Sequence, residues 1–377
     1  MVNLLVDLSD ERFAPDALAR ARGAIESGGF SFERGRADDR LLAWLDDAFG
    51  GTWSSEAFAA NNVVATSRDR HVGFAAYAAQ GLKFSWLRGY GARPDVGIFG
   101  PFGVDPAFRG SPAGPNLLIA ALASLRENGY AHALIPAVGE EKLIAYYARH
   151  TGARIVERFE KDRWQQRKWR TTVLASGNGS NFQTVLDAVG GGRLPLEITT
   201  LVTNNERAYA IERARAAHVR SLLILPWHRA TTTRADYDDL LRREVEASAP
   251  ELVLLLGWMH LLDASFVASF PEMINIHPAF LPLDQSRDVV GMPDGSQIRA
   301  YRGAHAIRDA LRDESRWVGA SSHRVTLDAD CGPVLVRKPL AIVPGEDAAA
   351  ILERLHPIEH RVLTSGIMRW VYERPEG

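Results

Sequence analysis

Two polar side chains stand two residues apart in the apolar run MINIHPAFLP, residues 273–282. On a β-strand, positions i and i+2 point to the same side, so Asn275 and His277 would project together, and Pro278 would end regular strand pairing. An amide that donates hydrogen bonds and an imidazole that titrates near neutral pH suit acid–base chemistry. The pair also fits a capping asparagine beside a half-buried histidine, so it does not establish a site by itself.

Two further segments carry side chains that suit catalysis or binding. SGNGSN, residues 176–181, places glycines between a strand and a helix, where backbone N–H groups and the helix dipole can bind an anion. Phe182 stands where a dinucleotide fingerprint needs a third glycine, which disfavours NAD binding. Asp330 precedes a Gly-Pro turn, and His323 lies in ASSHRVTL. Turn chemistry and strand packing explain each residue alone, whereas together they form a candidate active-site set.

Strand and helix patterns alternate after residue 170. TTVLAS, LEITTLVTNN, SLLIL, ELVLLLG and MINIH are predicted strands, and NFQTVLDAV, AYAIERARAAH and YDDLLRREVEASA are predicted helices. This alternation predicts a doubly wound, mostly parallel sheet, in which ligands bind beyond the carboxyl ends of the strands. GNGSN, GWMH and NIHP all follow predicted strands, so we expect them to line one crevice.

The first 160 residues have a different α/β pattern. NNVVATSRDRHVGFAAYAA reads as two strands, VGIFGPFGVDPAFRG as a strand entering a loop, and GPNLLIAALASLRENG as a helix with Pro115 near its first position. HALIPAV is a further strand and KLIAYYARH a further helix. The charged stretch at 160–170 is interpreted as a solvated linker or an edge strand. We therefore expect one domain over 1–165 and a second over 171–377.

Composition limits the class of protein. The chain has 377 residues, 44 basic against 46 acidic, and a net charge of −2, which argues against a nucleic-acid-binding surface over the whole molecule. Cys331 is the single cysteine, so an intrachain disulfide is impossible. The first residues resemble no signal peptide, and no apolar run is long enough to span a bilayer. We expect a soluble, cytoplasmic protein without a metal site, a membrane partner or a nucleic-acid partner. A homodimer is one option for its assembly.

Residues 171–377 resemble the glycinamide ribonucleotide transformylase family of 10-formyltetrahydrofolate-dependent formyltransferases. The resemblance rests on SGNGSN, GWMHLL, INIHPAFLP, YRGAHAIRDAL, VGASSHRVTLDADCGPVL and IEH, in the family's order. It implies a Rossmann-like domain that transfers a formyl group from 10-formyltetrahydrofolate to an amine or hydroxylamine of a small, anionic acceptor. The residues it implies are catalytic Asn275, His277 and Asp330; substrate-binding Gly177, Asn178, Gly179, Ser180, Asn181 and Glu359; and folate-binding Met259, His260, Leu262, Arg234 and His323.

The chemistry implied by this resemblance explains the three catalytic residue types. As an amine attacks the formyl carbon, the carbonyl oxygen becomes an oxyanion, and Asn275 and a protonated His277 can donate to it. Asp330 can hold His277 as a cation and relay a proton from the amine to the departing folate nitrogen, directly or through water.

The sequence also departs from the formyltransferase pattern. His260 replaces a usual arginine, Ala279 and Phe280 replace Ser-Leu, and residues 283–300 form a polar insertion that we expect to be a surface loop beside the amine. The acceptor therefore stays open between an amine of a specialised pathway and glycinamide ribonucleotide itself. Hydrolysis of formyltetrahydrofolate is a weaker alternative, since the related deformylases lack GNGSN. A folate or acyl-CoA sensor without turnover is a further alternative.

The N-terminal half resembles the GNAT (Gcn5-related) acyltransferase family, through FGPFGVDPAFRGSPAGPNLLIAAL and LIAYYARHTGA. The resemblance implies acyl-CoA binding by a pyrophosphate loop and a tyrosine general acid, matched here by Arg109, Gly110, Ser111, Gly114 and Tyr147. Pro112 occupies a glycine position of that loop and has no N–H to donate. The alternatives are a second acyltransferase activity or a degenerate domain used for gating or dimerisation.

Overall fold

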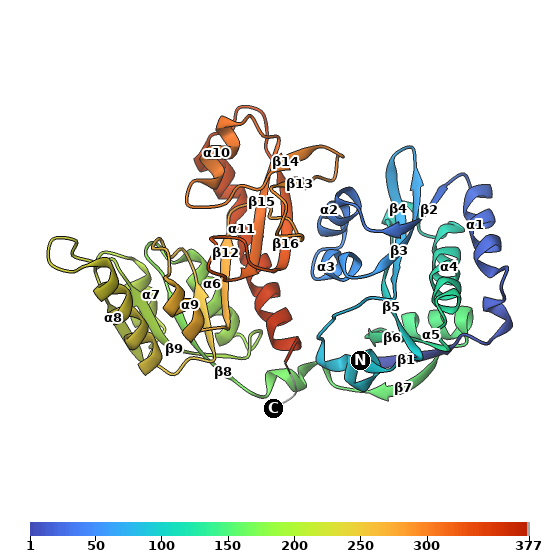
Figure 1. Ribbon diagram of the computed structural model, residues 1–377, viewed down its shortest axis with the longest axis horizontal. Coiled ribbons are helices and arrows are strands. Elements are labelled where there is room, and N and C mark those ends of the chain that lie inside the picture. Colours follow the sequence, from blue (N-terminus) through green and yellow to red (C-terminus); the bar gives the residue numbers. More distant parts are fainter. Residues whose placement is uncertain (375–377) are drawn as a thin grey trace. The chain divides into compact units, whose positions relative to one another are not determined.

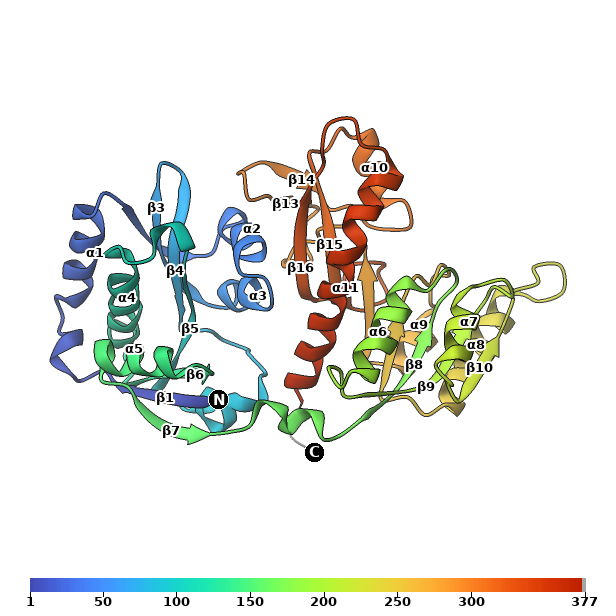
Figure 2. The ribbon, with the colours of Figure 1, turned by 180° about the vertical axis from the view of Figure 1, so that it is seen from behind.

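The computed structural model describes residues 1–374, apart from the side chains of residues 161 and 162. Contacts divide the chain into unit 1, Met1–Arg163 with residues 372–374, and unit 2, Trp164–Val371. Within the described residues, strands form two seven-stranded sheets and a two-stranded hairpin (Figure 1, and from behind in Figure 2). The predicted α/β class is confirmed. No helix among residues 1–374 is long and apolar enough to cross a membrane.

Unit 1 is a twisted sheet with helices on both faces. Its strands, in the order β2-β3-β4-β5-β6-β1-β7, are β1 (Val2–Asp7), β2 (Ser31–Arg36), β3 (Asn61–Ser67), β4 (Arg70–Tyr77), β5 (Val96–Val104), β6 (His132–Val138) and β7 (Arg154–Arg158). Helices α1 (Ala17–Ser27) and α4 (Ala113–Glu127) cover one face, and α2 (Asp39–Ala48) and α3 (Trp53–Phe58) cover the other (Figures 1 and 2). Helix α5 (Glu141–Thr151) connects β6 to β7.

The sheet of unit 1 splits between β5 and β6. These parallel strands pair only from Val96 to Ile98 on β5 and from His132 to Leu134 on β6. Both strands then continue, β5 to Val104 beside β4 and β6 to Val138 beside β1. Backbone groups that face the gap beyond the paired residues therefore have no strand partner there, which leaves room for a ligand between the strands.

Helix α4 begins earlier than the sequence pattern predicts. Pro112 is its N-cap, with φ −67° and ψ −13°, and Ala113 is the first helical residue, so Pro115 lies inside the first turn. Both prolines are tolerated because first-turn N–H groups have no intrahelical acceptor and the fixed φ of proline fits a helix. The structure thus places Pro115 near the start of the helix, as predicted, while the helix itself begins at Ala113.

Unit 2 has the doubly wound order expected of a Rossmann-like sheet, β10-β9-β8-β11-β12-β15-β16. The strands are β8 (Trp169–Leu174), β9 (Leu196–Thr203), β10 (Ser221–Ile224), β11 (Leu252–Leu255), β12 (Met273–His277), β15 (Trp317–Arg324) and β16 (Val334–Ala341). The first five are mutually parallel, and β15 is antiparallel to its neighbours β12 and β16.

The helices of unit 2 lie on both faces of this sheet. They are α6 (Ser180–Gly190), α7 (Ala210–Ala216), α8 (Arg234–Ala247), α9 (Ala264–Ser269), α10 (Ala306–Arg312) and α11 (Ala348–Tyr372). Helices α6 and α7 cover one face, and α8 and α9 cover the other (Figures 1 and 2). The core between α8, α9 and the sheet contains buried Tyr237, Phe266 and Met273.

The insertion at 283–300 is a hairpin and not the surface loop expected from its composition. Strands β13 (Val289–Gly291) and β14 (Gln297–Arg299) pair in antiparallel register. Val290 and Met292 are buried, at 1% and 0% exposure, so the hairpin has an apolar side that packs against the unit. The short β-branched run around position 290 and the Asp-Gly turn at 294–295 are the sequence signals for this structure.

Candidate functional site

The strand order of unit 2 reverses between β8 and β11, and the loops that follow these two strands meet. The Ser176 N–H donates to the Gly257 carbonyl at 3.2 Å, and the Met259 N–H donates to the Ser176 hydroxyl at 3.1 Å. Open α/β sheets bind ligands at such a reversal, beyond the carboxyl ends of the strands. The fold thus directs the search for a site to these loops and to the neighbouring end of β12.

Strands β12 and β15 bring three of the predicted side chains together. Their antiparallel register sets Asn275 opposite His323 and His277 opposite Ser321. The two histidines are almost fully enclosed, at 5% exposure for His277 and 2% for His323. Buried polar groups of this kind need partners, because an unpaired one costs free energy.

Asp330 lies on the tight connection between β15 and β16. The Arg324 N–H donates to the Pro333 carbonyl at 2.9 Å, which closes this loop. A Cβ atom at Gly332 would lie 1.7 Å from the Arg324 carbonyl oxygen, so only glycine fits there. Asp330 has φ 55°, in the left-handed region that aspartate tolerates better than most residues. The loop therefore holds the carboxylate in one place, facing both histidines.

The Asp330 carboxylate is surrounded by donors from several segments. It accepts from the Gly303 N–H at 2.7 Å and from the Asn275 amide at 3.2 Å. His277 Nδ1 lies 3.5 Å from Oδ2, and His323 Nε2 lies 3.3 Å from Oδ1. Burial opposes its charge, but the hydrogen bond from His323, the charge of His277 and the Gly303 N–H hold the pKa of Asp330 well below its usual range. Asp330 is therefore an anion at neutral pH.

His277 has an acceptor at each ring nitrogen. Its Nε2 lies 2.7 Å from the Tyr301 carbonyl, and because a carbonyl oxygen only accepts, Nε2 carries a proton. Burial lowers the pKa of His277, whereas the charge of Asp330 and the Tyr301 carbonyl act in the opposite direction. The ring therefore alternates between a neutral form protonated on Nε2 and a cation whose Nδ1–H points at Asp330.

The Asn275 amide is shared between Asp330 and His323. His323 Nδ1 donates to the Arg324 carbonyl at 2.9 Å, and its Nε2 lies 3.1 Å from Asn275 Nδ2. Because the Asn275 amide nitrogen only donates, its two N–H groups point to the Asp330 carboxylate and to His323 Nε2. His323, expected in the folate pocket, thus also belongs to this polar cluster.

A cavity of about 360 Å³ opens onto the cluster. Its wall includes Asn275, His277, His323 and Asp330 together with the predicted residues Asn181, Met259, His260, Leu262 and Glu359. Gly177, Asn178, Gly179, Ser180 and Arg234 are outside this wall. The structure therefore gathers the three catalytic candidates and most binding candidates around one hollow.

The GNGSN turn leads into the N-terminus of α6, as its sequence predicts. Gly179 has φ 74°, and a Cβ there would lie 3.0 Å from the Ala210 Cβ, so glycine serves both the turn and the close approach of α7. Arg213 Nε donates to the Asn178 carbonyl and its Nη2 to the Asn178 side chain, both at 2.9 Å. Arg213 thereby fixes the turn beside Asn181, which lines the cavity.

The predicted folate-binding residues surround an aromatic cluster. The His260 ring makes edge contacts with Trp227, Tyr237 and Trp258, at centroid distances of 5.6 to 5.8 Å. Burial and nearby arginines lower the pKa of His260, which favours the neutral ring. Arg234 is bound by Asp238 at 2.7 Å and by the Leu261 carbonyl, so it supports the 257–262 loop and does not line the cavity.

Glu359 lies on α11 at the opposite wall, and its side chain is 7% exposed. Burial raises its pKa to about 7, although the Asn181 amide acts in the opposite direction. His356 Nε2 lies 4.0 Å from its carboxylate. Glu359 is therefore a carboxyl group that changes charge near neutral pH at the edge of a ligand cavity.

We expect Glu359→Gln to remove a pH-dependent loss of stability. A folded-state pKa raised above the ordinary 4.5 stabilises the fold fully below that pH, and this contribution is lost as pH rises through about 7. The free energy of unfolding falls by roughly 3 kcal/mol over this pH range. Urea unfolding of unit 2 between pH 4 and 8 checks this: the Gln variant should match the native chain at pH 4 and exceed it at pH 8. The exposed Glu353→Gln, earlier on the same helix, is the control, and parallel profiles for all three proteins would contradict the assignment.

Sequence reasoning missed the roles of Tyr301 and Gly303. The Tyr301 carbonyl and the Gly303 N–H contact His277 and Asp330 through the backbone, which every residue type carries. The motif YRGAHAIRDAL marks the segment but gives no sign of these contacts. Trp258 and His356, which also line the cavity, were likewise not assigned.

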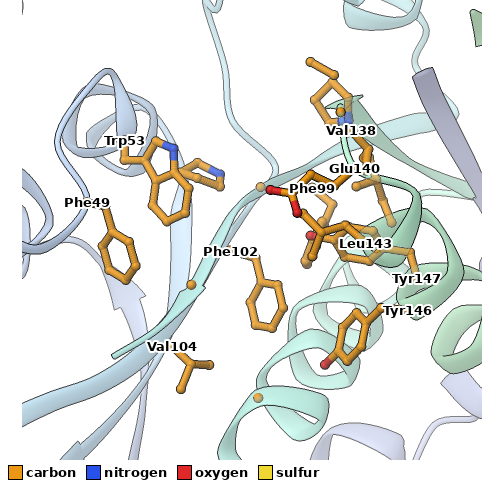
Figure 3. A pocket seen from close by; sticks show the side chains of 18 of the residues that line it. Phe49, Trp53, Phe99, Phe102, Val104, Val138, Glu140, Leu143, Tyr146 and Tyr147 are labelled. Atoms are coloured by element: carbon orange, nitrogen blue, oxygen red, sulfur yellow. The ribbon is translucent and has the colours of Figure 1, made fainter. Parts of the chain in front are cut away.

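The candidates of unit 1 line a separate cavity of about 890 Å³. Arg109, Gly110, Ser111, Gly114 and Tyr147 all belong to its wall. So do Phe99–Val104 and residues 135–138, which flank the split between β5 and β6. Figure 3 shows aromatic side chains on both sides of β5 in this cavity. Burial raises the pKa of Tyr147.

Comparison with known proteins matches the second half of the chain. Residues 169–367 match the formyl transferase family. A phosphoribosylglycinamide formyltransferase of Dictyostelium discoideum is 32% identical over 211 residues, covering 52% of this chain and 94% of that protein. The enzyme of the same name from Escherichia coli K12 is 31% identical over 191 residues, covering 50% and 81%.

Solved structures match the same half. The glycinamide ribonucleotide transformylase 1 of Symbiobacterium toebii covers 53% of this chain and 86% of its own, with 30% identity and a TM-score of 0.46.

Proposed function

Because this chain belongs to the formyl transferase family, we propose that unit 2 transfers a formyl group from 10-formyltetrahydrofolate to the amine of glycinamide ribonucleotide. The observation that carries the proposal is the bonded cluster of Asn275, His277 and Asp330 on one cavity wall. The cluster combines donors for a developing oxyanion with a fixed carboxylate for a moving proton, which is what acyl transfer to an amine needs.

Asn275 and His277 stabilise the negative charge that forms on the formyl oxygen when the amine attacks. An N–H of the Asn275 amide is one donor, and His277 Nε2–H is the other. In the ligand-free arrangement His277 Nε2–H bonds to the Tyr301 carbonyl at 2.7 Å, so the formyl oxygen has to share or replace this acceptor. Active-site hydrogen bonds commonly become optimal only once the substrate is bound.

Asp330 moves the proton. The attacking amine becomes cationic as its bond to the formyl carbon forms, and Asp330, ionised at neutral pH, accepts a proton from it directly or through water. The same proton passes to the folate nitrogen as its bond to the formyl carbon breaks, so Asp330 ends the cycle ionised. His277 in its cationic form balances the carboxylate charge during this exchange.

The choice of glycinamide ribonucleotide rests on the far wall of the cavity and on the relatives. Asn181 is the last residue of GNGSN and lies at the N-terminus of α6, a place that binds phosphate well, and Glu359 can accept hydrogen bonds from sugar hydroxyls. The matched curated relatives have the corresponding name. None of the described residues 283–300 lines this cavity, so the hairpin does not narrow the acceptor site directly.

An acceptor screen read by mass tests the proposal. The purified chain is incubated with 10-formyltetrahydrofolate and glycinamide ribonucleotide, its unphosphorylated riboside, other amines and hydroxylamines, or water alone. We expect a gain of one formyl group on the ribonucleotide and much less on the riboside. Preferential formylation of an uncharged amine would overturn the acceptor, free formate alone would indicate a hydrolase, and binding without any product would indicate a sensor.

The split sheet favours a second function, acyl-CoA binding by unit 1. An extended chain with amide groups can pair with strand edges that lack a partner, and the gap between β5 and β6 opens into the cavity that Arg109 and Gly110 line. Figure 3 shows Phe102 and Tyr146 along this cavity, where they offer apolar contact to a thioester chain. This half would then add a second acyl transfer to the formyl transfer of unit 2.

We expect weak acetyl-CoA binding that tightens in Pro112→Gly. Pro112 caps α4 without an N–H group, so one donor to the pyrophosphate is lost, which weakens binding by about ten- to a hundredfold. Calorimetry with acetyl-CoA on both proteins measures the difference. Pro106→Gly, outside the turn, is the control. Tight binding by the unmodified chain would show that Pro112 does not limit the loop, and no binding by either protein would support a degenerate domain.

A further inference from the structure

The hairpin β13–β14 is tied to the rest of unit 2 at its tip. The Trp317 indole N–H donates to the Asp294 carboxylate at 3.0 Å, and Asp294 also closes the turn by accepting from the Ser296 hydroxyl at 2.6 Å. Met292 beneath this turn is fully buried. The hairpin is therefore an ordered part of the unit, so that a shift of its tip would also shift its base.

At the base of the hairpin, Arg302 joins the two ends of the insertion. Its Nη1 donates to the Asp288 carboxylate at 2.6 Å, and its Nη2 donates to the Arg287 carbonyl at 3.0 Å. The Ala300 N–H donates to the Asp288 carbonyl at 2.8 Å. The Arg302 side chain is only 19% exposed, and its planar guanidinium is held against residues 287 and 288.

The neighbours of Arg302 in the chain contact the catalytic candidates directly. Tyr301, one residue before, offers its carbonyl to His277 Nε2 at 2.7 Å. Gly303, one residue after, donates its N–H to Asp330 at 2.7 Å. Any movement of residues 301–303 therefore changes both contacts at once.

We propose that Arg302 is a positioning residue for formyl transfer, which grips the hairpin base and so sets the Tyr301 carbonyl against His277 and the Gly303 N–H against Asp330. This inference rests on the proposed function and extends it to the insertion, which lies outside the cavity. The insertion thus acts on the reaction through the backbone of residues 301–303.

The hydrogen bonds of Arg302 to the hairpin base and the positive charge of Arg302 have opposite effects on the pKa of His277. Besides burial, the groups that act on the pKa of His277 are Asp330 and the Tyr301 carbonyl, which contact its ring, and the charges of His323 and Arg302. The Tyr301 carbonyl raises the pKa of His277 by accepting from its cation, whereas the charge of Arg302 lowers that pKa. A variant that loses only the hydrogen bonds of Arg302 to residues 287 and 288 should therefore lower the pKa of His277. A variant that loses these hydrogen bonds and the positive charge together should shift that pKa less.

Arg302→Lys and Arg302→Gln separate these two effects. Lysine keeps the positive charge but cannot bridge Asp288 and the Arg287 carbonyl with a planar fork, whereas glutamine loses both. With glycinamide ribonucleotide and 10-formyltetrahydrofolate, we expect both variants to lower kcat by about three- to tenfold, with little change in KM. We expect the His277 titration, followed by NMR of 13C-labelled histidine and assigned with His277→Gln, to move to lower pH in Arg302→Lys and to move less in Arg302→Gln.

Two further variants keep the test decisive. Asp288→Asn changes a side chain that is 87% exposed, so it leaves the core intact and should give a smaller shift in the same direction as Arg302→Lys. Asp284→Asn is the control: it lies in the same insertion, its carboxylate accepts from the Ser286 N–H and hydroxyl, and its change should leave the titration unchanged. Unaltered kcat and His277 titration in Arg302→Lys, Arg302→Gln and Asp288→Asn would overturn the inference. The titration uses the protein without substrates, so this outcome is distinct from failure of formyl transfer itself.

Discussion

We expect His277→Ala to lower the rate of formyl transfer by roughly a hundredfold or more, about 3 kcal/mol of lost transition-state stabilisation. The side chain is 5% exposed, lines the cavity and lies within 3.5 Å of the Asp330 carboxylate, so no solvent molecule easily replaces its donor. Its removal also takes away one of the neighbouring charges that hold the pKa of Asp330 below its usual range. Stopped assays of formyl transfer to glycinamide ribonucleotide under saturating 10-formyltetrahydrofolate measure the effect.

His305→Ala is the matched control for this variant. His305 precedes α10, is exposed and makes no side-chain capping hydrogen bond, so its loss should leave the rate unchanged. Circular dichroism and thermal unfolding establish that both variants are folded. A folded His277→Ala protein with near-native turnover would show that the cluster on β12 is not the catalytic centre.

The second large effect is expected for Asp330→Asn, which keeps the shape of the side chain and removes its charge. Asparagine tolerates the backbone angle of 55° at this position, so the loop can retain its conformation. The variant cannot accept the proton of the attacking amine, and His277 loses the anion that raises its pKa. We expect a loss of at least a hundredfold in kcat, together with a shift of the His277 titration to lower pH.

Asp328→Asn tests whether any change in this loop has the same effect. Asp328 is exposed, and its backbone carbonyl accepts from the Thr326 hydroxyl and the Cys331 N–H. We expect native rates from it across the pH range. Equal losses in Asp328→Asn and Asp330→Asn would assign the effect to the loop conformation and remove the proton-transfer role from Asp330.

Local sequence pattern determined much of this molecule, because side-chain periodicity and turn chemistry depend on neighbouring residues. MINIH is a strand whose period of two sets Asn275 and His277 on the same side, and the structure places both on one cavity wall. GNGSN is a turn that needs a left-handed glycine before a helix, and Gly179 has that conformation. The alternation of strands and helices after residue 170 was sufficient to predict the doubly wound sheet of unit 2.

Only the tertiary structure decided which distant groups meet these side chains. His323 faces Asn275 because β15 pairs with β12 in one antiparallel register, and Asp330 reaches Asn275 across 55 positions of sequence. Composition made the insertion look like a loop, whereas burial of Val290 and Met292 makes it a hairpin. The contacts of Tyr301 and Gly303 use backbone groups, which all residue types share. The edges of β5 and β6 beyond their paired residues likewise present backbone groups. Such contacts follow from how strands pair and pack over the whole unit, and no local pattern of residue types encodes them.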